Sequence, residues 1–264
     1  MKDKKIAIIG CGNLGLTIAN GLLDDGFSAA DLIATRRNTA SLDSLLDNGA
    51  TVTSNNAEAV KNADVIVLAV KPYNVEPILA EIKNELKPDK HILVCLATGI
   101  TLDELAKWSG SELPIFRAMP NTAADVNESM TLICDKGATN EQRNAITGLF
   151  DKIGSTLYID ENLMEAATIL GACGIAYVLR FMRAMIQGGI EVGFDAKTAT
   201  AIVSQTMKGA SELIIQNETH PESEIDKVTT PKGCTITGLN EMEHAGFSSA
   251  LIKGIVASYK KIEK

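Results

Sequence analysis

A mostly apolar run from Lys5 to Ile9 leads directly into the sequence GCGNLG, which spans Gly10–Gly15 and has the GxGxxG spacing. At a strand-to-helix turn, each glycine of this pattern has a physical task. Gly10 permits a tight turn, Gly12 lets a pyrophosphate approach the backbone, and Gly15 lets the helix pack closely on the strand. The free N–H groups at the start of the helix attract phosphates. The pattern therefore predicts a dinucleotide site, to which Asn13 and Leu14 also belong.

The residues after the second predicted strand, Leu32–Thr35, indicate which dinucleotide binds. An NAD site usually has an acidic residue there for the ribose 2′-hydroxyl, but this chain has Thr35, Arg36 and Arg37. Guanidinium groups make charge-assisted contacts with phosphates, so these residues suit the 2′-phosphate of NADPH. We therefore expect NADPH to be preferred and NADH to be used more weakly. The alternative is that the two arginines form a solvated surface pair.

Further cofactor candidates follow other predicted strands, because ligands of doubly wound sheets bind at the carboxyl ends of the strands. Asn56 is one of them. The others close or follow the apolar run Ala63–Val70, and they are Ala69, Val70, Lys71 and Pro72. We expect their backbone to reach the cofactor, whereas a lysine after a strand is more often simply solvated.

These candidates need a scaffold, and the first half of the chain supplies one by alternating short β-branched runs with helical patterns. Such alternation predicts βαβ units in a doubly wound, mostly parallel sheet of the α/β class. The predicted strands are 5–9, 32–35, 63–70, 91–97, 115–119 and 130–134. Helical patterns lie at 14–24, from Ser41 onward, and near 75–86.

Near Asp160 the strand signals stop and helical patterns take over. The predicted helices span 161–193, 196–218, 232–245 and 249–260. We therefore predict a dinucleotide-binding domain at residues 1–162 and an all-α domain for substrate binding and dimerisation at 163–264. The segment Ala166–Leu179 carries no charge and contains Gly171 and Gly174, which suggests close packing. Since obligate dimers use core-like interfaces, we expect this apolar surface to bury against a second copy of the chain.

Composition narrows the possible partners and the compartment. Of the 264 residues, 25 are Lys or Arg and 33 are Asp or Glu, so the formal net charge is −8. This acidic balance disfavours nucleic acid and anionic membrane surfaces as partners. The five cysteines and three histidines are scattered, which predicts reduced thiols and no metal site. The uncharged segment Ile6–Leu23 divides into a strand and a glycine-containing helix, so it is neither a signal peptide nor a membrane span. We expect a cytoplasmic protein.

Several motifs occur together in one known family. They are GCGNLG, LAVKP at Leu68–Pro72, MPNT at Met119–Thr122, ESMT at Glu128–Thr131, and the long segment from His220 to Phe247. That last segment is similar to a signature in which V-T-S-P-G-G-T-T is followed by G-L and then L-E-x-x-G-F. On these residues the chain resembles the pyrroline-5-carboxylate reductase family over nearly its whole length.

The resemblance implies an N-terminal Rossmann domain and helical C-terminal domains that interlock into a homodimer, with rings of dimers in some members. It implies hydride transfer from NAD(P)H to the C=N carbon of Δ1-pyrroline-5-carboxylate, a small cyclic imine carboxylate, to give L-proline. By the same resemblance, we place Met119 and Asn121 near the nicotinamide.

The sequence Thr229–Thr235 has the features of a helix start. Thr230 is a suitable N-cap, Pro231 is a favoured first helical residue, and the N–H groups of Gly233, Cys234 and Thr235 would be unpaired. A helix start of this kind binds anions. By resemblance, the loop binds the substrate's carboxylate, and Thr230 and Thr235 match residues that bind it. The alternative is an ordinary capped helix.

We assign no catalytic acid or base, because no acid–base pair is evident near these segments. If the ring nitrogen of the imine arrives protonated, its carbon is already electrophilic. The protein then contributes orientation and a dry pocket, while the cofactor carries the chemistry.

Two departures from the family pattern keep other functions open. The chain reads Gly171-Ala172-Cys173-Gly174-Ile175 where the family usually has S-G-S-G-P, and Lys232 replaces a glycine. Without the proline we expect a straighter helix, and we expect Lys232 to point to solvent. The alternatives are a diverged paralogue that reduces another cyclic imine or a 3-hydroxy acid, and a non-catalytic dinucleotide-binding accessory protein.

Overall fold

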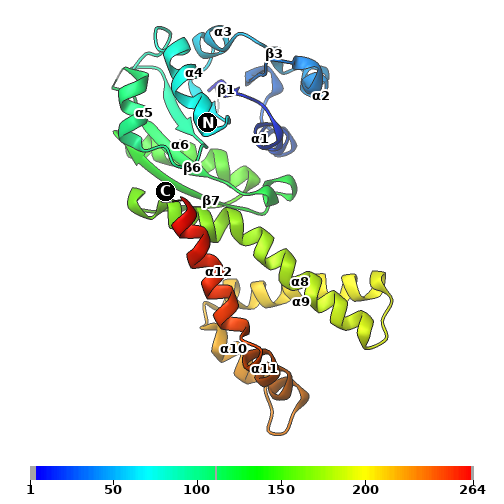
Figure 1. The fold of residues 1–264 in the computed structure, drawn as a ribbon. Coiled ribbons are helices and arrows are strands. Elements are labelled where there is room, and N and C mark those ends of the chain that lie inside the picture. The colour runs from blue at the N-terminus through cyan, green and yellow to red at the C-terminus, as the bar shows by residue number, and fades with distance from the viewer. Residues whose placement is uncertain (1–3, 111, 263–264) are drawn as a thin grey trace. The chain divides into compact units, whose positions relative to one another are not determined.

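The computed structural model describes residues 4–110 and 112–262. The chain divides into two compact units, one that extends to Ile175 and one from Ala176 to Lys261 (Figure 1). This division lies beyond the predicted boundary between residues 162 and 163. The reason is that Met164, Thr168 and Ile169 are buried, and Met164 belongs to the hydrophobic core of the N-terminal unit.

An eight-stranded sheet forms the centre of the N-terminal unit. Its strands lie in the order β3-β2-β1-β4-β5-β6-β7-β8, and all neighbours are parallel except β6 and β7. The order reverses between β1 and β4, which is where doubly wound sheets bind dinucleotides. The predicted fold class is therefore confirmed. The strands are β1 (Ile6–Ile9), β2 (Leu32–Thr35), β3 (Thr51–Thr53), β4 (Val65–Leu68), β5 (Ile92–Cys95), β6 (Ile115–Met119), β7 (Ser129–Lys136) and β8 (Gly154–Tyr158).

Two hydrophobic cores cover the two faces of this sheet. In β1, Ile6 and Ile8 belong to the core that contains residues of α1 and α6, whereas Ala7 and Ile9 belong to the core that contains residues of α3, α4 and α5. Burial on both faces explains why the central strands are almost uniformly apolar. The helices of this unit are α1 (Asn13–Asp24), α2 (Asp43–Asp47), α3 (Asn56–Lys61), α4 (Val75–Ile82), α5 (Leu102–Ser109), α6 (Asn140–Phe150) and α7 (Met164–Thr168).

The predicted helix 161–193 is present from Glu161 to Glu191 but is not regular. It begins with a 3-10 turn (Glu161–Leu163) and continues through α7 into a π-turn (Ile169–Cys173), after which α8 (Gly174–Glu191) follows. The absence of a proline at Ile175 predicts a straighter helix. The structure instead has an irregular turn just before Ile175, so this irregularity does not depend on a proline.

The C-terminal unit consists of helices with little core of their own. Between residues 176 and 261, all of which the structure describes, Ala199 and Val203 are the only buried residues. Large apolar side chains are exposed instead, among them Leu179, Ile215 and Ile252. A second copy of the chain would cover such a surface. The helices after α8 are α9 (Ala196–Asn217), α10 (Pro221–Val228), α11 (Cys234–His244) and α12 (Phe247–Ile262) (Figure 1).

By length and composition, the stretch Glu161–Glu191 is also apolar enough to cross a membrane, and 6% of its most apolar window is buried within the chain. A helix that packs against another subunit has the same length and composition.

His91, just before β5, is a buried histidine. Its Nδ1 accepts a hydrogen bond from the Lys87 N–H at 2.9 Å, and burial, together with the nearby charge of Lys90, lowers the pKa of the imidazole. In the unfolded chain a histidine has a pKa of about 6.5. The unfolded state therefore binds more protons than the folded state between these two pKa values, and stability falls as the pH drops below about 6.5.

We expect His91→Asn to remove this pH dependence, because the Asn side chain can still accept from Lys87 but does not titrate. We expect the free energy of unfolding to decrease less in the variant than in the wild type when the pH falls from 7.5 to 5.5. Urea denaturation at several pH values measures this difference. The exposed His244→Asn is the control and should follow the wild type. Parallel curves for His91→Asn and wild type would show that the pKa of His91 is not depressed.

Candidate functional site

The turn between β1 and α1 is built around the first glycine of the GxGxxG pattern. Gly10 has φ +81, and an ideal Cβ on it would lie 2.1 Å from Val70 Cγ1. The Cys11 N–H donates to the carbonyl of Thr35 at 2.7 Å, which ties the turn to β2. The backbone thus adopts a conformation and a contact that a side chain at position 10 would prevent.

The other two glycines differ in what surrounds them. A Cβ on Gly15 would meet Ile8 Cγ2 at 3.1 Å and Ala69 Cβ at 3.2 Å, so this glycine lets α1 pack on β1 and β4. A Cβ on Gly12 would have only the Gly10 carbonyl oxygen nearby, at 3.9 Å. Gly12 is the N-cap of α1 and makes no side-chain cap. The helix start is therefore open at the position where the pattern places a pyrophosphate, with exposed Asn13 and half-buried Leu14 beside it.

Thr35 and Asn56 form a polar link behind this turn rather than an open polar surface. The Thr35 hydroxyl accepts from the Gly10 N–H at 3.2 Å and donates to Asn56 Oδ1 at 2.7 Å. The Asn56 amide donates in turn to Glu81 at 3.2 Å. Thr35 is 1% exposed, so its hydroxyl holds the turn in place and leaves the arginines as the groups available to a 2′-phosphate.

Arg36 and Arg37 follow β2 and face different surroundings. Arg36 is half-buried, and its Nη1 donates to the Ser41 hydroxyl at 2.5 Å. Its charge reaches the glycine turn: burial raises the pKa of Cys11 to about 12, and Arg36 opposes that rise. Arg37 is exposed and has no ion-pair partner in the described part of the chain. Ser41 is a polar neighbour of this cationic site that the sequence pattern did not reveal, since nothing in its spacing distinguishes it from other serines.

The segment after β4 lies against the same turn. The Ala69 N–H donates to the Ile9 carbonyl at 2.9 Å, and Val70 is the contact that excludes a side chain at Gly10. Lys71 is exposed, and Pro72 begins a short 3-10 turn. The structure therefore brings the Ala69 backbone and the Val70 side chain beside the glycine turn and places the Lys71 side chain in solvent, and contact of this segment with the cofactor stays a prediction.

Met119 and Asn121 mark the carboxyl end of β6 and are both buried, at 7% exposure each. The Asn121 side chain already has hydrogen-bond partners. Its Oδ1 accepts from the Ala123 N–H at 2.9 Å, and its Nδ2 donates to the carbonyl of Gly171 at 3.0 Å.

The predicted substrate loop starts its helix later than expected. Gly233, not Thr230, is the N-cap, and α11 begins at Cys234. Pro231 and Lys232 instead form a turn in which the Gly233 N–H donates to the Thr230 carbonyl at 2.9 Å. Lys232 has φ +60, a conformation that ends any helix begun at Pro231. Cys234 and Thr235 are therefore the first residues of the helix, and their N–H groups point out of its start.

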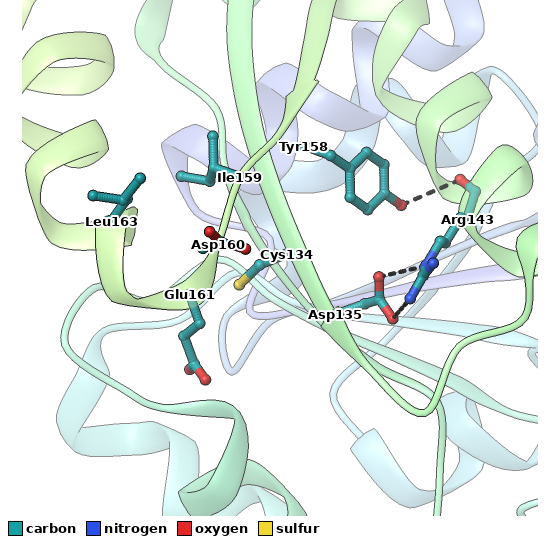
Figure 2. Close-up of a pocket in the computed structure, with 8 residues that line it drawn as sticks. All are labelled: Cys134, Asp135, Arg143, Tyr158, Ile159, Asp160, Glu161 and Leu163. Carbon is teal, nitrogen blue, oxygen red and sulfur yellow. Dashed lines mark hydrogen bonds and ion pairs between the residues drawn. The ribbon is translucent and has the colours of Figure 1, made fainter.

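One pocket of about 550 Å³ lies elsewhere in the N-terminal unit, between β7, β8 and the start of the long helical stretch (Figure 2). Asp135 pairs with Arg143 on one side of it, through Nε to Oδ2 at 2.7 Å. Glu161 on another side pairs with the buried Arg117 at 3.1 Å. Because β7 is antiparallel to β6, Asp135 lies opposite Phe116, near the amino end of β6. The pocket therefore lies at the end of the sheet where β6 begins, whereas the glycine turn lies at the carboxyl ends of the parallel strands.

Comparisons with known proteins match both parts of the chain. A family described as "Pyrroline-5-carboxylate reductase dimerisation" matches residues 161–264, and one described as "NADP oxidoreductase coenzyme F420-dependent" matches residues 5–98. Pyrroline-5-carboxylate reductase 1 of Dictyostelium discoideum is 40% identical over 98% of this chain and 49% of its own length, so this chain spans about half of that relative. Pyrroline-5-carboxylate reductase 2 of the same organism is 40% identical, over 99% of this chain and 93% of its own length.

Solved structures agree with the sequence relatives. A pyrroline-5-carboxylate reductase from Coxiella burnetii has a TM-score of 0.91 and 28% identity, with 98% of this chain and 97% of the other covered. A Plasmodium falciparum pyrroline carboxylate reductase with NADP bound has a TM-score of 0.89 and 26% identity, with 99% and 98% covered.

Two substitutions separate the two roles of these glycines. Gly15 lets α1 pack closely on the sheet, and Gly12 lets a phosphate approach the backbone. We expect Gly15→Ala to lower the free energy of unfolding by about 1–3 kcal/mol, because its Cβ must displace Ile8 or Ala69. Gly12→Ala should lower stability by only about 0.5–1 kcal/mol, the usual effect of Ala at an N-cap, but weaken NADPH binding at least about tenfold, or about 1.4 kcal/mol. Urea denaturation and fluorescence titration with NADPH measure the two effects. Wild-type affinity in Gly12→Ala would mean that no phosphate approaches that residue.

Proposed function

The chain belongs to the pyrroline-5-carboxylate reductase family, and from this membership we propose that it reduces Δ1-pyrroline-5-carboxylate to L-proline with NADPH. The observation that carries the proposal is the 40% identity to a pyrroline-5-carboxylate reductase over 99% of this chain and 93% of that relative. The enzyme is an NAD(P)H-dependent oxidoreductase. The open glycine turn and the cationic residues after β2 fit the cofactor that this activity requires.

NADPH, when bound, supplies the hydride that reaches the C=N carbon. Gly12 and the free N–H groups at the start of α1 hold the pyrophosphate, with Asn13 and Leu14 at its side. Arg36 and Arg37 bind the 2′-phosphate, and the Thr35–Asn56 link keeps β2 and the turn in register with them. The backbone of Ala69–Pro72 lines the cofactor on the β4 side, and Met119 and Asn121 lie toward the nicotinamide.

The start of α11 binds the carboxylate of the imine. The N–H groups of Cys234 and Thr235 are free of side-chain caps, and the dipole of this 11-residue helix adds positive potential at its first turn. The Gly233 N–H, predicted to be unpaired, donates to the Thr230 carbonyl at 2.9 Å and is therefore not one of these donors. Thr230 supplies a hydroxyl and Thr235 a second one. We propose no general acid: a protonated ring nitrogen already makes the carbon electrophilic, so the chain's own task is to orient the imine and to keep water away.

The chain acts as a dimer through its C-terminal helices. The apolar side chains that a single chain leaves exposed support this assembly. We further propose that dimers associate into rings, that the enzyme is cytoplasmic, and that the substrate and dimerisation functions reside in residues 163–264.

A coupled assay tests the proposed activity directly. NADPH oxidation followed at 340 nm should depend on Δ1-pyrroline-5-carboxylate, with proline as the product and weaker rates with NADH. Cofactor binding without turnover of this imine would favour an accessory protein, and turnover of a 3-hydroxy acid or of another cyclic imine instead would favour a diverged paralogue.

The choice of cofactor should depend on the two arginines after β2. We expect Arg36→Ala/Arg37→Ala to raise the KM for NADPH at least about tenfold, because charge-assisted contacts worth about 1.5–3 kcal/mol are lost. The KM for NADH should stay within about twofold. Lys83→Ala/Lys107→Ala removes the same charge from exposed positions and is the control. If NADPH and NADH are affected equally, the arginines do not read the 2′-phosphate.

A further inference from the structure

Asn121 hydrogen-bonds within its own loop, to the next strand and to a turn 50 residues away. Its N–H donates to the Ser129 hydroxyl at 3.0 Å, its Oδ1 accepts from Ala123 at 2.9 Å, and its Nδ2 donates to the Gly171 carbonyl at 3.0 Å. The MPNT motif is thereby joined to the ESMT motif and to the irregular start of the long helix. The backbone N–H and both polar side-chain atoms of this buried residue therefore have hydrogen-bond partners within the N-terminal unit.

The carbonyl that accepts from Asn121 belongs to the π-turn Ile169–Cys173. Interruptions of an α-helix arise at proline, at small residues, or where a side chain inserts into the hydrogen-bond ladder. This turn has no proline, since Ile175 follows it, but it contains Gly171 and receives a side-chain amide at that residue. The Asn121 amide is therefore the group from outside the helix that supports the irregular conformation.

The π-turn lies against the carboxyl end of β6. A Cβ on Gly171 would meet Leu132 Cδ1 at 3.4 Å, and Leu132 is the strand neighbour of Met119, the last residue of β6. Ala172 packs against the core cluster that contains Met119. In a doubly wound sheet the second mononucleotide half of the cofactor lies over the carboxyl ends of the strands on this side of the switch point.

We propose that Asn121 is a positioning residue for the reduction: by donating to the Gly171 carbonyl, it fixes the π-turn beside the carboxyl end of β6, where hydride transfer takes place. The inference rests on the proposed function for the location of that step. A misplacement of about 1 Å can lower the rate of a reaction about 100-fold, so a small shift of this turn lowers the rate of hydride transfer without releasing the cofactor.

Asn121→Asp isolates the hydrogen bond to Gly171. An Asp side chain can still accept from Ala123, but as a carboxylate it cannot donate to the carbonyl. When it is protonated its O–H can donate, and burial favours that protonated form. Asn121→Ser keeps a capping oxygen, is too short to reach Gly171, and does not titrate. Asn62→Asp removes a comparable Asn-to-helix-carbonyl bond, to Glu58 at 3.0 Å, at an exposed position and is the control.

At pH 8 we expect both Asn121 variants to lower kcat about 10–100-fold, with the NADPH dissociation constant within about twofold of wild type. As the pH falls from 8 to 6, Asn121→Asp should recover at least several-fold relative to Asn121→Ser. Asn62→Asp should match wild type throughout. Amide hydrogen exchange of residues 169–176 should be at least about fivefold faster in both Asn121 variants at pH 8.

Three results would overturn the proposal. Unchanged exchange in residues 169–176 would show that Asn121 does not hold the turn. A loss of NADPH affinity as large as the loss of kcat would make Asn121 a cofactor ligand, and identical pH profiles for Asn121→Asp and Asn121→Ser would make the loss a general structural effect. An inactive wild-type protein would refute the proposed function. Hydrogen exchange does not need turnover, so it would still show whether Asn121 supports the turn.

Discussion

The N-terminal unit depends on the close approach of three backbone segments around Gly10. Val70 Cγ1 occupies the space in which a side chain would begin, 2.1 Å from an ideal Cβ, and Gly15 repeats the constraint against Ile8 and Ala69. These contacts fix α1 relative to both β1 and β4. The free N–H groups at the start of α1 are then directed at the place where the strand order reverses. Between these two packed glycines, Gly12 has only the Gly10 carbonyl oxygen nearby, so its backbone is the part of the turn that is open to a phosphate.

An acidic protein that binds two anions must create positive potential locally. The formal net charge is −8, so long-range attraction does not bring NADPH or a carboxylate to this chain. Two kinds of local group take its place. Helix starts without a side-chain cap occur at Gly12 and Gly233, and Arg36 is held beside the glycine turn by Ser41. Fixed N–H groups and a partly buried guanidinium act over short distances, where screening by solvent is weakest.

The sequence predicted those parts of the fold in which local pattern and tertiary environment agree. The central strands are buried on both faces, so their apolar runs marked them clearly. The short β3 and the partly exposed β8, which lie at the two edges of the sheet, carry no such run and were missed. The glycine turn was located from sequence because the GxGxxG spacing expresses a chemical requirement, whereas the binding of a 2′-phosphate by the arginines after β2 stays a prediction. Ser41 was not found because nothing distinguishes it from other serines near Arg36, and the carbonyl of Gly171 was not found because it lies 50 residues from Asn121 and its role leaves no pattern in the sequence.

Two local departures from sequence rules lie in the segments to which we assign substrate binding and hydride transfer. Lys232 adopts φ +60, although a glycine would do so at less cost, and it delays the start of α11 until Cys234. The π-turn interrupts a stretch whose residues would otherwise continue as an α-helix. A non-glycine residue at positive φ costs free energy of order 1–3 kcal/mol and persists only where surrounding contacts enforce it. The turn closed between Thr230 and Gly233 enforces the first, and the buried amide of Asn121 enforces the second. Both keep polar backbone groups in positions that a regular helix would not allow.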